Sequence, residues 1–151
     1  MRRALRSGLL AVVVFSGITQ AGVVSKHGAL KIAGNNVVDA AGKPIQLAGM
    51  SLYWPLWGGE VFFNAGAIKT TVDWGASIVR VPIAVGNVKA DGTPQSLYTG
   101  NVAPIIAAVD GAIANDIYVI IDWHVEQDAP QEANAITFFT DMAKKYGRNP
   151  H

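Results

Sequence analysis

The segment from Tyr118 to His124, with the sequence YVIIDWH, most constrains what this chain can fold into. It begins with apolar, mostly β-branched residues, which predict a parallel strand buried on both faces. It ends in Asp122, Trp123 and His124, and no Gly or Pro separates them from the strand. Parallel α/β folds place their ligand sites at the C-terminal ends of such strands. A strand that simply ends in polar residues explains the same pattern equally well. The rest of the chain must decide between this interpretation and a ligand site.

The first 21 residues have the pattern of a secretory signal peptide. Three arginines precede the apolar run Leu9 to Phe15, which is too short to cross a bilayer as a helix. Cleavage is expected after Ala21, with a retained N-terminal anchor as the alternative. The expected domains are therefore a signal peptide at 1–21 and a mature segment at 22–151 that is secreted or periplasmic.

Charge and composition narrow the class of partner. Removing the signal leaves nine basic and eleven acidic residues, a net charge of −2. This excludes the basic surface of a nucleic-acid-binding protein, and no later stretch is apolar enough to cross a membrane. The chain has no cysteine and only three histidines, so we expect no structural zinc. We also expect no cofactor. The expected partner is a neutral ligand, and the full-length protein is expected to be a monomer.

The order of elements predicts a parallel α/β fold. A hairpin turns at Gly34-Asn35, and three strand–loop–helix units follow. The expected strands are 45–51, 77–81 and 118–124, and the expected helices are 64–74, 102–113 and 132–146. Short αβ links and long βα loops are typical of a (β/α)8 TIM barrel, which has eight such units. We therefore expect the N-terminal hairpin and about three units of a barrel, ending before its fourth strand.

Individual residues indicate where the predicted helices and strands begin and end. Asn64 is expected to cap the first helix and Gly75 to follow its last turn. Pro82 is expected to stop the second strand, because proline has no N–H to donate to a ladder. The last helix is expected to bury an apolar stripe that consists of Ile136, Phe139, Met142, Ala143 and Tyr146.

Arg80 and His124 are the candidate catalytic residues. A guanidinium within an apolar strand needs a partner, because an unpaired buried charge is strongly destabilising. Arg80 is interpreted as a donor that orients an active-site carboxylate, and a structural ion pair with Asp122 or Asp73 is the alternative. His124 can hold a sugar hydroxyl, and a core histidine is the alternative. Asp122 and His124 could form half a metal site, but further ligands are lacking and no metal is expected.

Aromatic residues after the first strand are candidate ligand platforms. Tyr53, Trp54 and Trp57 lie next to Gly58-Gly59, on a loop expected to expose its rings to the flat faces of a ligand such as a pyranose. Phe62 and Phe63 are expected to be packing. The acidic residues after the third strand, which are Glu126, Asp128 and Glu132, are interpreted as solvated loop charges, although Glu126 and Asp122 could form an acid/base pair.

Four motifs in order resemble family 5 glycoside hydrolases, and most of all the bacterial endoglucanases (cellulases). They are GMSLYW at 49–54 with WGGE at 57–60, DWGA at 73–76 with IVRVP at 78–82, VDGAIA at 109–114 with YVIIDWH at 118–124, and MAKKYG at 142–147. The resemblance covers about residues 28–150. It implies hydrolysis of β-1,4-glucan, such as cellulose, by a retaining mechanism in which two glutamates lie about 5 Å apart.

The resemblance also assigns roles. Arg80 would orient the nucleophile, His124 would line the catalytic subsite, and Trp57 would stack on a glucosyl ring. The acid/base glutamate belongs to an Asn-Glu-Pro motif expected a few residues beyond His151, and the nucleophile lies on a later strand, so the segment alone is expected to be inactive. Relatives often have histidine where Tyr53 stands. The alternatives are a noncatalytic carbohydrate-binding remnant and an enzyme of this family directed at mannan or xylan.

Overall fold

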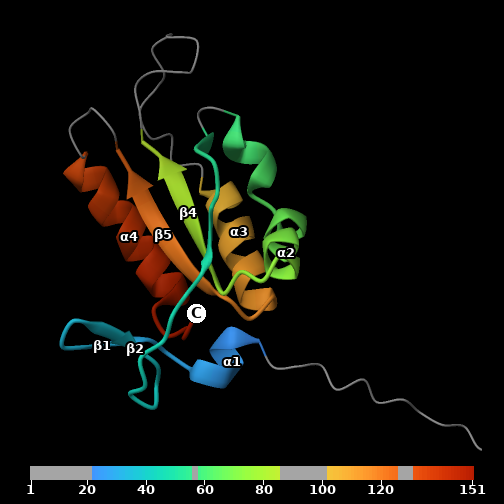
Figure 1. Ribbon diagram of the computed structural model, residues 1–151. Helices are drawn as coiled ribbons and strands as arrows, with labels where there is room; N and C mark the ends of the chain where they lie inside the picture. The colour runs from blue at the N-terminus through green and yellow to red at the C-terminus, as the bar shows by residue number, and fades with distance from the viewer. Residues whose placement is uncertain (1–21, 56–57, 86–101, 126–130) are drawn as a thin grey trace, which may run out of the picture.

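The computed structural model describes residues 22–55, 58–85, 102–125 and 131–151, which form a small hairpin and a parallel sheet flanked by helices (Figure 1). The elements in order are α1 (Val23–His27), β1 (Lys31–Ala33), β2 (Asn36–Val38), β3 (Gly49–Ser51), the 3-10 helix η2 (Gly59–Phe62), α2 (Ala65–Asp73), β4 (Ile78–Ala84), α3 (Ala103–Ala114), β5 (Tyr118–His124) and α4 (Glu132–Tyr146). The predicted hairpin and the three strand–helix units are confirmed.

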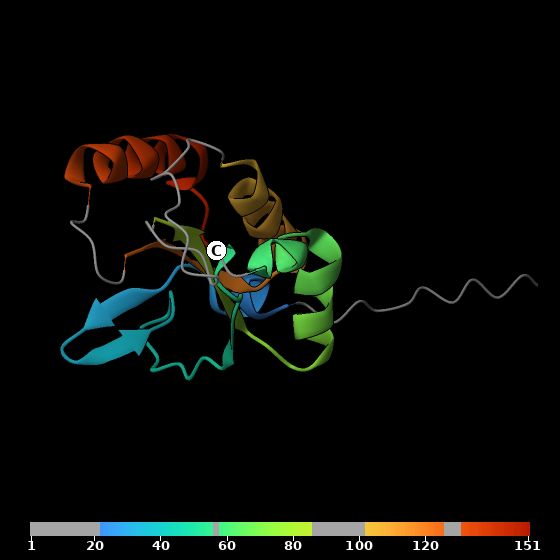
Figure 2. The same cartoon turned by 90° about the horizontal axis from the view of Figure 1, so that it is seen from above.

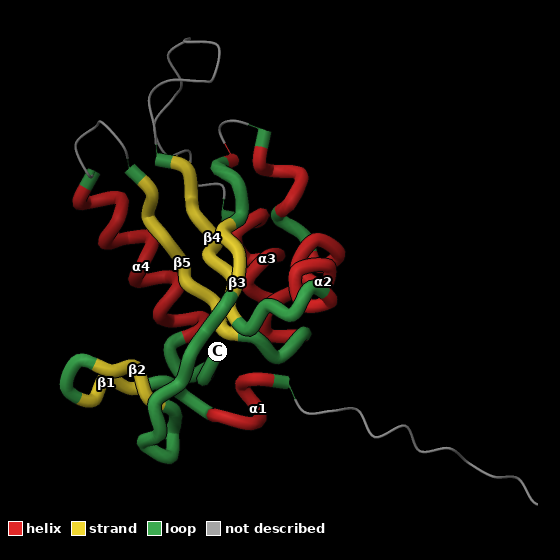
Figure 3. Tube along the Cα trace, viewed as in Figure 1, coloured by secondary structure: helices red, strands yellow, loops and turns green. Residues whose placement is uncertain are grey.

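The sheet has the strand order β3-β4-β5, and both neighbouring pairs are parallel (Figure 3). Helix α2 connects β3 to β4 through η2, and α3 connects β4 to β5, as in βαβ units. The helices α2, α3 and α4 lie on one side of the sheet (Figure 2). The opposite side is open, and Ile120 there is 48% exposed. The prediction that β5 is buried on both faces is therefore wrong for this side chain.

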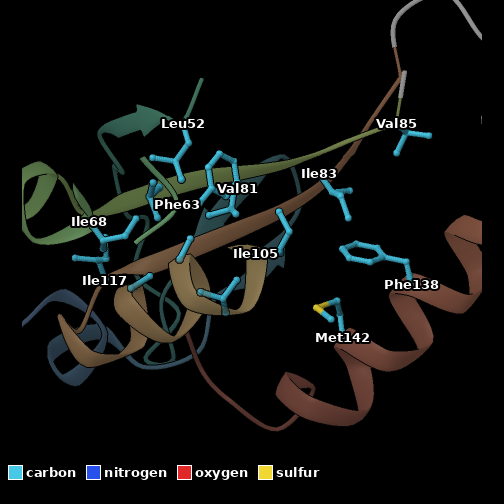
Figure 4. Packing of buried hydrophobic residues seen from close by; sticks show 14 residues of the cluster. Leu52, Phe63, Ile68, Val81, Ile83, Val85, Ile105, Ile117, Phe138 and Met142 are labelled. Carbon is cyan, nitrogen blue, oxygen red and sulfur yellow. The ribbon is translucent and has the colours of Figure 1, made fainter. Parts of the chain in front are cut away.

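The core lies between the sheet and these helices. Val79, Val81 and Ile83 of β4 point toward the helices and are almost fully buried. In Figure 4, Phe138 and Met142 reach from α4 toward Ile83. The buried side of α4 therefore centres on Phe138 and Met142.

The predicted stripe of α4 is correct for Met142 but wrong for Ile136, Phe139 and Ala143, which are exposed. Ile136 is 58% exposed and Phe139 is 43% exposed. Phe138 is buried instead, because its ring packs against Trp123 of β5 at a centroid distance of 5.4 Å. Helix α4 has apolar residues on two adjacent faces, and the contact with β5 selects between them.

Strand β3 is shorter than predicted, since only Gly49–Ser51 pair with β4. The preceding residues bond elsewhere: the Ile45 N–H donates to the Val37 carbonyl of the hairpin, at 3.1 Å. Gly49 is required by a close approach of two backbones. A Cβ at this position would lie 1.7 Å from the Ile78 carbonyl oxygen.

Strand β4 runs through Pro82, so the prediction that this proline ends the strand is wrong. The Ser77 carbonyl accepts from Tyr118 N–H and the Val85 N–H donates to the His124 carbonyl, so the odd-numbered residues of β4 bond to β5. The even-numbered residues, Pro82 included, face β3 instead. The missing N–H of Pro82 therefore leaves the ladder with β5 intact, and β3, on the other side, pairs with β4 only as far as Ser51.

Helix α2 begins and ends as the sequence predicts. The Asn64 side chain accepts a hydrogen bond from Ala67 N–H at 3.0 Å and so caps the first turn. Gly75 follows the last turn with a φ of 92°, a left-handed conformation that favours glycine. Pro104 lies in the first turn of α3, where proline is tolerated.

The hairpin and α1 cover the end of the sheet at which the strands begin, which we call the floor (Figure 1). The Val24 N–H donates to the Asp116 carbonyl, and the Tyr118 hydroxyl donates to the Gly28 carbonyl at 2.6 Å. After α4 the chain returns to the floor, where the His151 carbonyl accepts from Val119 N–H at 2.9 Å. Within the described ranges, no helix has the length and apolar character needed to cross a membrane.

Candidate functional site

Four polar side chains meet on the open face of the sheet. The register pairs Ser51 with Arg80 and places Asp122 and His124 two and four residues beyond Ile120, the residue opposite Arg80. Alternate residues of a strand share a face, so all four side chains point away from the helices. We call the end of the sheet at which the strands finish the site end.

Arg80 is the centre of this group. Its Nη2 donates to Asp122 Oδ2 at 2.5 Å and lies 2.9 Å from Nδ1 of His124. Its Nη1 donates to the Ser51 hydroxyl at 2.8 Å. The guanidinium is thus held by groups from all three strands, and its orientation is fixed. The predicted alternative of an ion pair with Asp122 is the contact observed, whereas Asp73 pairs with Lys69 on the surface of α2.

Ser51 links the backbone of β3 to this charge pair. Its hydroxyl accepts from Arg80 and donates to the Leu52 carbonyl at 3.2 Å. Ser51 is not among the site residues predicted from the sequence. Its position directly opposite Arg80 in the register is the signal that would have identified it, and that signal requires the strand pairing.

The ring of His124 is held from a second direction by Trp54. The two rings meet edge to face, with centroids 5.6 Å apart and planes at 83°. These residues border a cavity of about 300 Å³ that is lined by Ser51, Leu52, Tyr53, Trp54, Arg80, Pro82 and His124. Four of the predicted site residues, Tyr53, Trp54, Arg80 and His124, therefore share one cavity.

The side chains of the charged group are partly open to solvent, with 35% of Arg80, 26% of Asp122 and 30% of His124 exposed. A ligand in the cavity can therefore reach Arg80 and His124, which line it. The guanidinium between Asp122 and His124 disfavours a metal ion there, because a cation would lie against another cation. Across the described ranges, no group of three or more potential metal ligands is present.

The other residues named from the sequence lie away from this cavity or outside the described residues. Trp57, Glu126 and Asp128, like the signal at 1–21, lie outside the described residues. Glu132 begins α4 and is exposed, in keeping with a solvated charge. Phe63 is buried, as predicted for packing, whereas Phe62 is 46% exposed and borders a separate apolar cavity beside β3 and α2.

A second polar cluster lies at the floor. Hydrogen bonds from the His27 side chain and from backbone N–H groups lower the pKa of Asp39 below its ordinary value. Burial raises the pKa of Asp116, but hydrogen bonds from Ser25 and His151 outweigh it and the net shift is downward. Burial, reinforced by these two carboxylates, raises the pKa of Tyr118.

Comparison with known proteins decides the family. The family model described as Cellulase (glycosyl hydrolase family 5) matches residues 38–151. The chain belongs to glycosyl hydrolase family 5. Family 5 domains are TIM barrels, and the parallel sheet with its helices on one side is part of that barrel.

Several relatives of the chain are named endoglucanases or cellulases. The chain is 38% identical to Endoglucanase Z from Dickeya dadantii over 99% of its own length and 36% of that protein. It is similar to a family 5 cellulase from an Icelandic hot spring isolate (28% identity, TM-score 0.70, 87% of this chain and 39% of that one). It is also similar to the catalytic domain of a Thermobifida fusca endoglucanase in complex with cellotetraose (27% identity, TM-score 0.65, 83% and 41%). The chain thus spans about a third of the length of Endoglucanase Z.

Proposed function

We propose that the protein is an endo-β-1,4-glucanase that cleaves glucan by the retaining mechanism with two glutamates. One observation carries the proposal: Arg80 is fixed by Ser51 and Asp122 beside His124, on the wall of a cavity at the site end of a family 5 sheet. Active sites of TIM barrels form at this end. The endoglucanase names of the relatives and the cellotetraose in one of them support glucan as the substrate.

Each described residue has a role in this proposal. Arg80 orients the catalytic carboxylate through the guanidinium N–H groups that do not bond to Ser51, Asp122 or His124. His124 donates to a sugar hydroxyl, and Tyr53 and Trp54 form the wall against which a glucosyl ring lies. Trp57 is proposed to stack on a further ring, by resemblance alone.

The two catalytic glutamates are proposed to lie outside this chain. Of the described glutamates, Glu60 lies in η2 and Glu132 in α4, and neither lines the cavity. The protein is further proposed to be secreted after removal of residues 1–21, on the basis of the basic, apolar and small-residue segments there. Mass spectrometry of the exported protein tests this, and a mature N-terminus at Gly22 is expected.

The function is tested by release of reducing ends from carboxymethylcellulose. The 151-residue chain should release none, and the protein from the natural reading frame that carries it should be active. In that active protein, Arg80→Lys should lower kcat about 100-fold, as when one donor to a developing charge is lost. Turnover by the chain alone that disappears in Glu126→Gln would show that the glutamates are assigned wrongly.

A noncatalytic carbohydrate-binding protein is the second candidate, and the half-exposed Tyr53 beside the cavity favours it. Calorimetric titration of the chain with cellotetraose distinguishes the two functions when combined with the activity assay. Binding that weakens in Tyr53→Ala, together with an inactive natural reading frame, supports the binding protein. Assays on mannan and xylan then test whether another polysaccharide is the substrate.

A further inference from the structure

We infer that Asp122 is a positioning residue that acts through Arg80 to place the proton of the neutral His124 imidazole on Nε2. Nη2 of Arg80 lies 2.5 Å from Asp122 Oδ2 and 2.9 Å from His124 Nδ1. An Nη nitrogen carries two protons, so it can donate to both neighbours at once.

The contact with arginine decides where the proton of His124 lies. Arginine stays protonated and has no acceptor atom, so a group in hydrogen-bond contact with it must accept. Nδ1 can accept only through its lone pair, and the proton of the neutral ring is then on Nε2. A proton on Nδ1 would set two N–H groups against each other at 2.9 Å.

Asp122 exerts the opposite preference on the ring, but more weakly. Its Oδ2 lies 3.3 Å from Nδ1, a distance beyond the ordinary range for an N–H···O bond. The same oxygen already accepts the much shorter bond from Arg80. The carboxylate therefore acts on the guanidinium, and the guanidinium acts on the imidazole.

Removal of the carboxylate should loosen this arrangement. Without Asp122, the guanidinium keeps the Ser51 contact through Nη1, but Nη2 loses its shortest contact. Trp54 still packs against the ring, so the ring plane is held while its proton is free to exchange between nitrogens. An N–H fixed on Nε2 would donate to a sugar hydroxyl, and this role rests on the proposed function. The tautomer itself does not depend on that function.

Long-range proton–nitrogen NMR spectra of the nitrogen-15-labelled protein, without ligand, test the inference. Mildly alkaline buffer keeps imidazole neutral, and His124→Gln identifies the signals of His124 among the three histidines. In the unsubstituted protein, Nδ1 of His124 should resonate as an unprotonated nitrogen and Nε2 as a protonated one. A proton on Nδ1 would overturn the inference.

In Asp122→Asn, the two nitrogen signals of His124 should move toward each other, as expected for exchange between tautomers. The matched control is Asp39→Asn, which removes the carboxylate 3.1 Å from Nδ1 of His27 and should shift only His27. Signals of His124 that stay in place in folded Asp122→Asn would contradict the role of Asp122. If that variant does not fold, Arg80→Ala, which removes the donor that faces Nδ1, should produce the same movement, and unchanged His124 signals would again overturn the inference.

Discussion

Histidine–aspartate contacts occur at both ends of the sheet, but the remaining partners of the aspartates differ. At the floor, Asp39 accepts hydrogen bonds from the backbone N–H groups of Ala41 and Lys43, both at 2.9 Å, besides its contact with His27. Asp116 likewise accepts from the backbone N–H of Ser25. These carboxylates bind main chain, and so they fasten turns and segments to one another.

At the site end, the contacts described for Asp122 are to side chains. Its oxygen holds Arg80, which in turn contacts His124 and Ser51. A carboxylate in this position orients other functional groups and fixes no turn. The same two residue types thus stabilise the fold at one end and arrange a site at the other, which matches the division of a TIM barrel into a stabilising and a catalytic face.

The largest expected effect on stability is that of Gly49→Ala at the floor end of β3. The new Cβ would lie 1.7 Å from the Ile78 carbonyl oxygen, and the two strands must separate to admit it. We expect a loss of about 3 kcal/mol or more in the free energy of unfolding, measured with urea. The control is Gly66→Ala in α2, where the nearest atom is Asn64 Oδ1 at 3.2 Å. Equal stability of the two variants would contradict the close pairing of β3 and β4.

Tyr118→Phe should have an intermediate effect and tests whether the floor fastens the N-terminal segment. The change removes the hydrogen bond to the Gly28 carbonyl and leaves the buried ring in place. We expect a loss of about 1 kcal/mol in the free energy of unfolding. The matched control is Tyr146→Phe, whose hydroxyl bonds to Asp110 at the exposed surface and should matter less. A larger loss in the control would show that the floor contact is not the stabilising one.

The smallest effect is expected for Asp39→Asn, in the acid unfolding of the protein. The folded pKa of Asp39 lies below its ordinary value of 3.8, so the fold favours the charged carboxylate. Its stabilising contribution is present above the unfolded pKa and is lost as the pH falls through the folded pKa. Asp39→Asn should therefore be less stable near neutral pH and lose less stability on acidification, as followed by circular dichroism. The control is Asp141→Asn on the exposed surface of α4.

Features fixed within one turn or one strand could be predicted from the sequence. The ends of α2 follow from Asn64 and Gly75, because a cap bonds to residues only a few positions away. The strand from Tyr118 to His124 was predicted at its full length. Arg80 and His124 are candidate site residues from the sequence, because a charge and an imidazole at the ends of apolar strands require an explanation, and in the structure they line one cavity.

Features that depend on a neighbour in space could not be predicted in this way. Whether proline breaks a strand depends on which neighbour its nitrogen faces, and Pro82 faces the side on which β3 has ended. The buried face of α4 depends on the ring that β5 presents, so Phe138 and not Phe139 is buried. Ser51 is an ordinary polar residue until the register places it opposite Arg80.

The proline in β4 has a further consequence for the mouth of the cavity. The Leu52 N–H donates to the Arg80 carbonyl. If the parallel ladder continued, its next hydrogen bond would run from the nitrogen of residue 82 to the Leu52 carbonyl. Pro82 has no N–H to donate, so the ladder between β3 and β4 cannot continue at this position. The Leu52 carbonyl accepts a hydrogen bond from the Ser51 hydroxyl instead. That bond turns the oxygen lone pairs of Ser51 toward Arg80. The missing main-chain proton of Pro82 thus ends the pairing of β3 with β4 and leaves the Ser51 hydroxyl oriented to accept from Arg80.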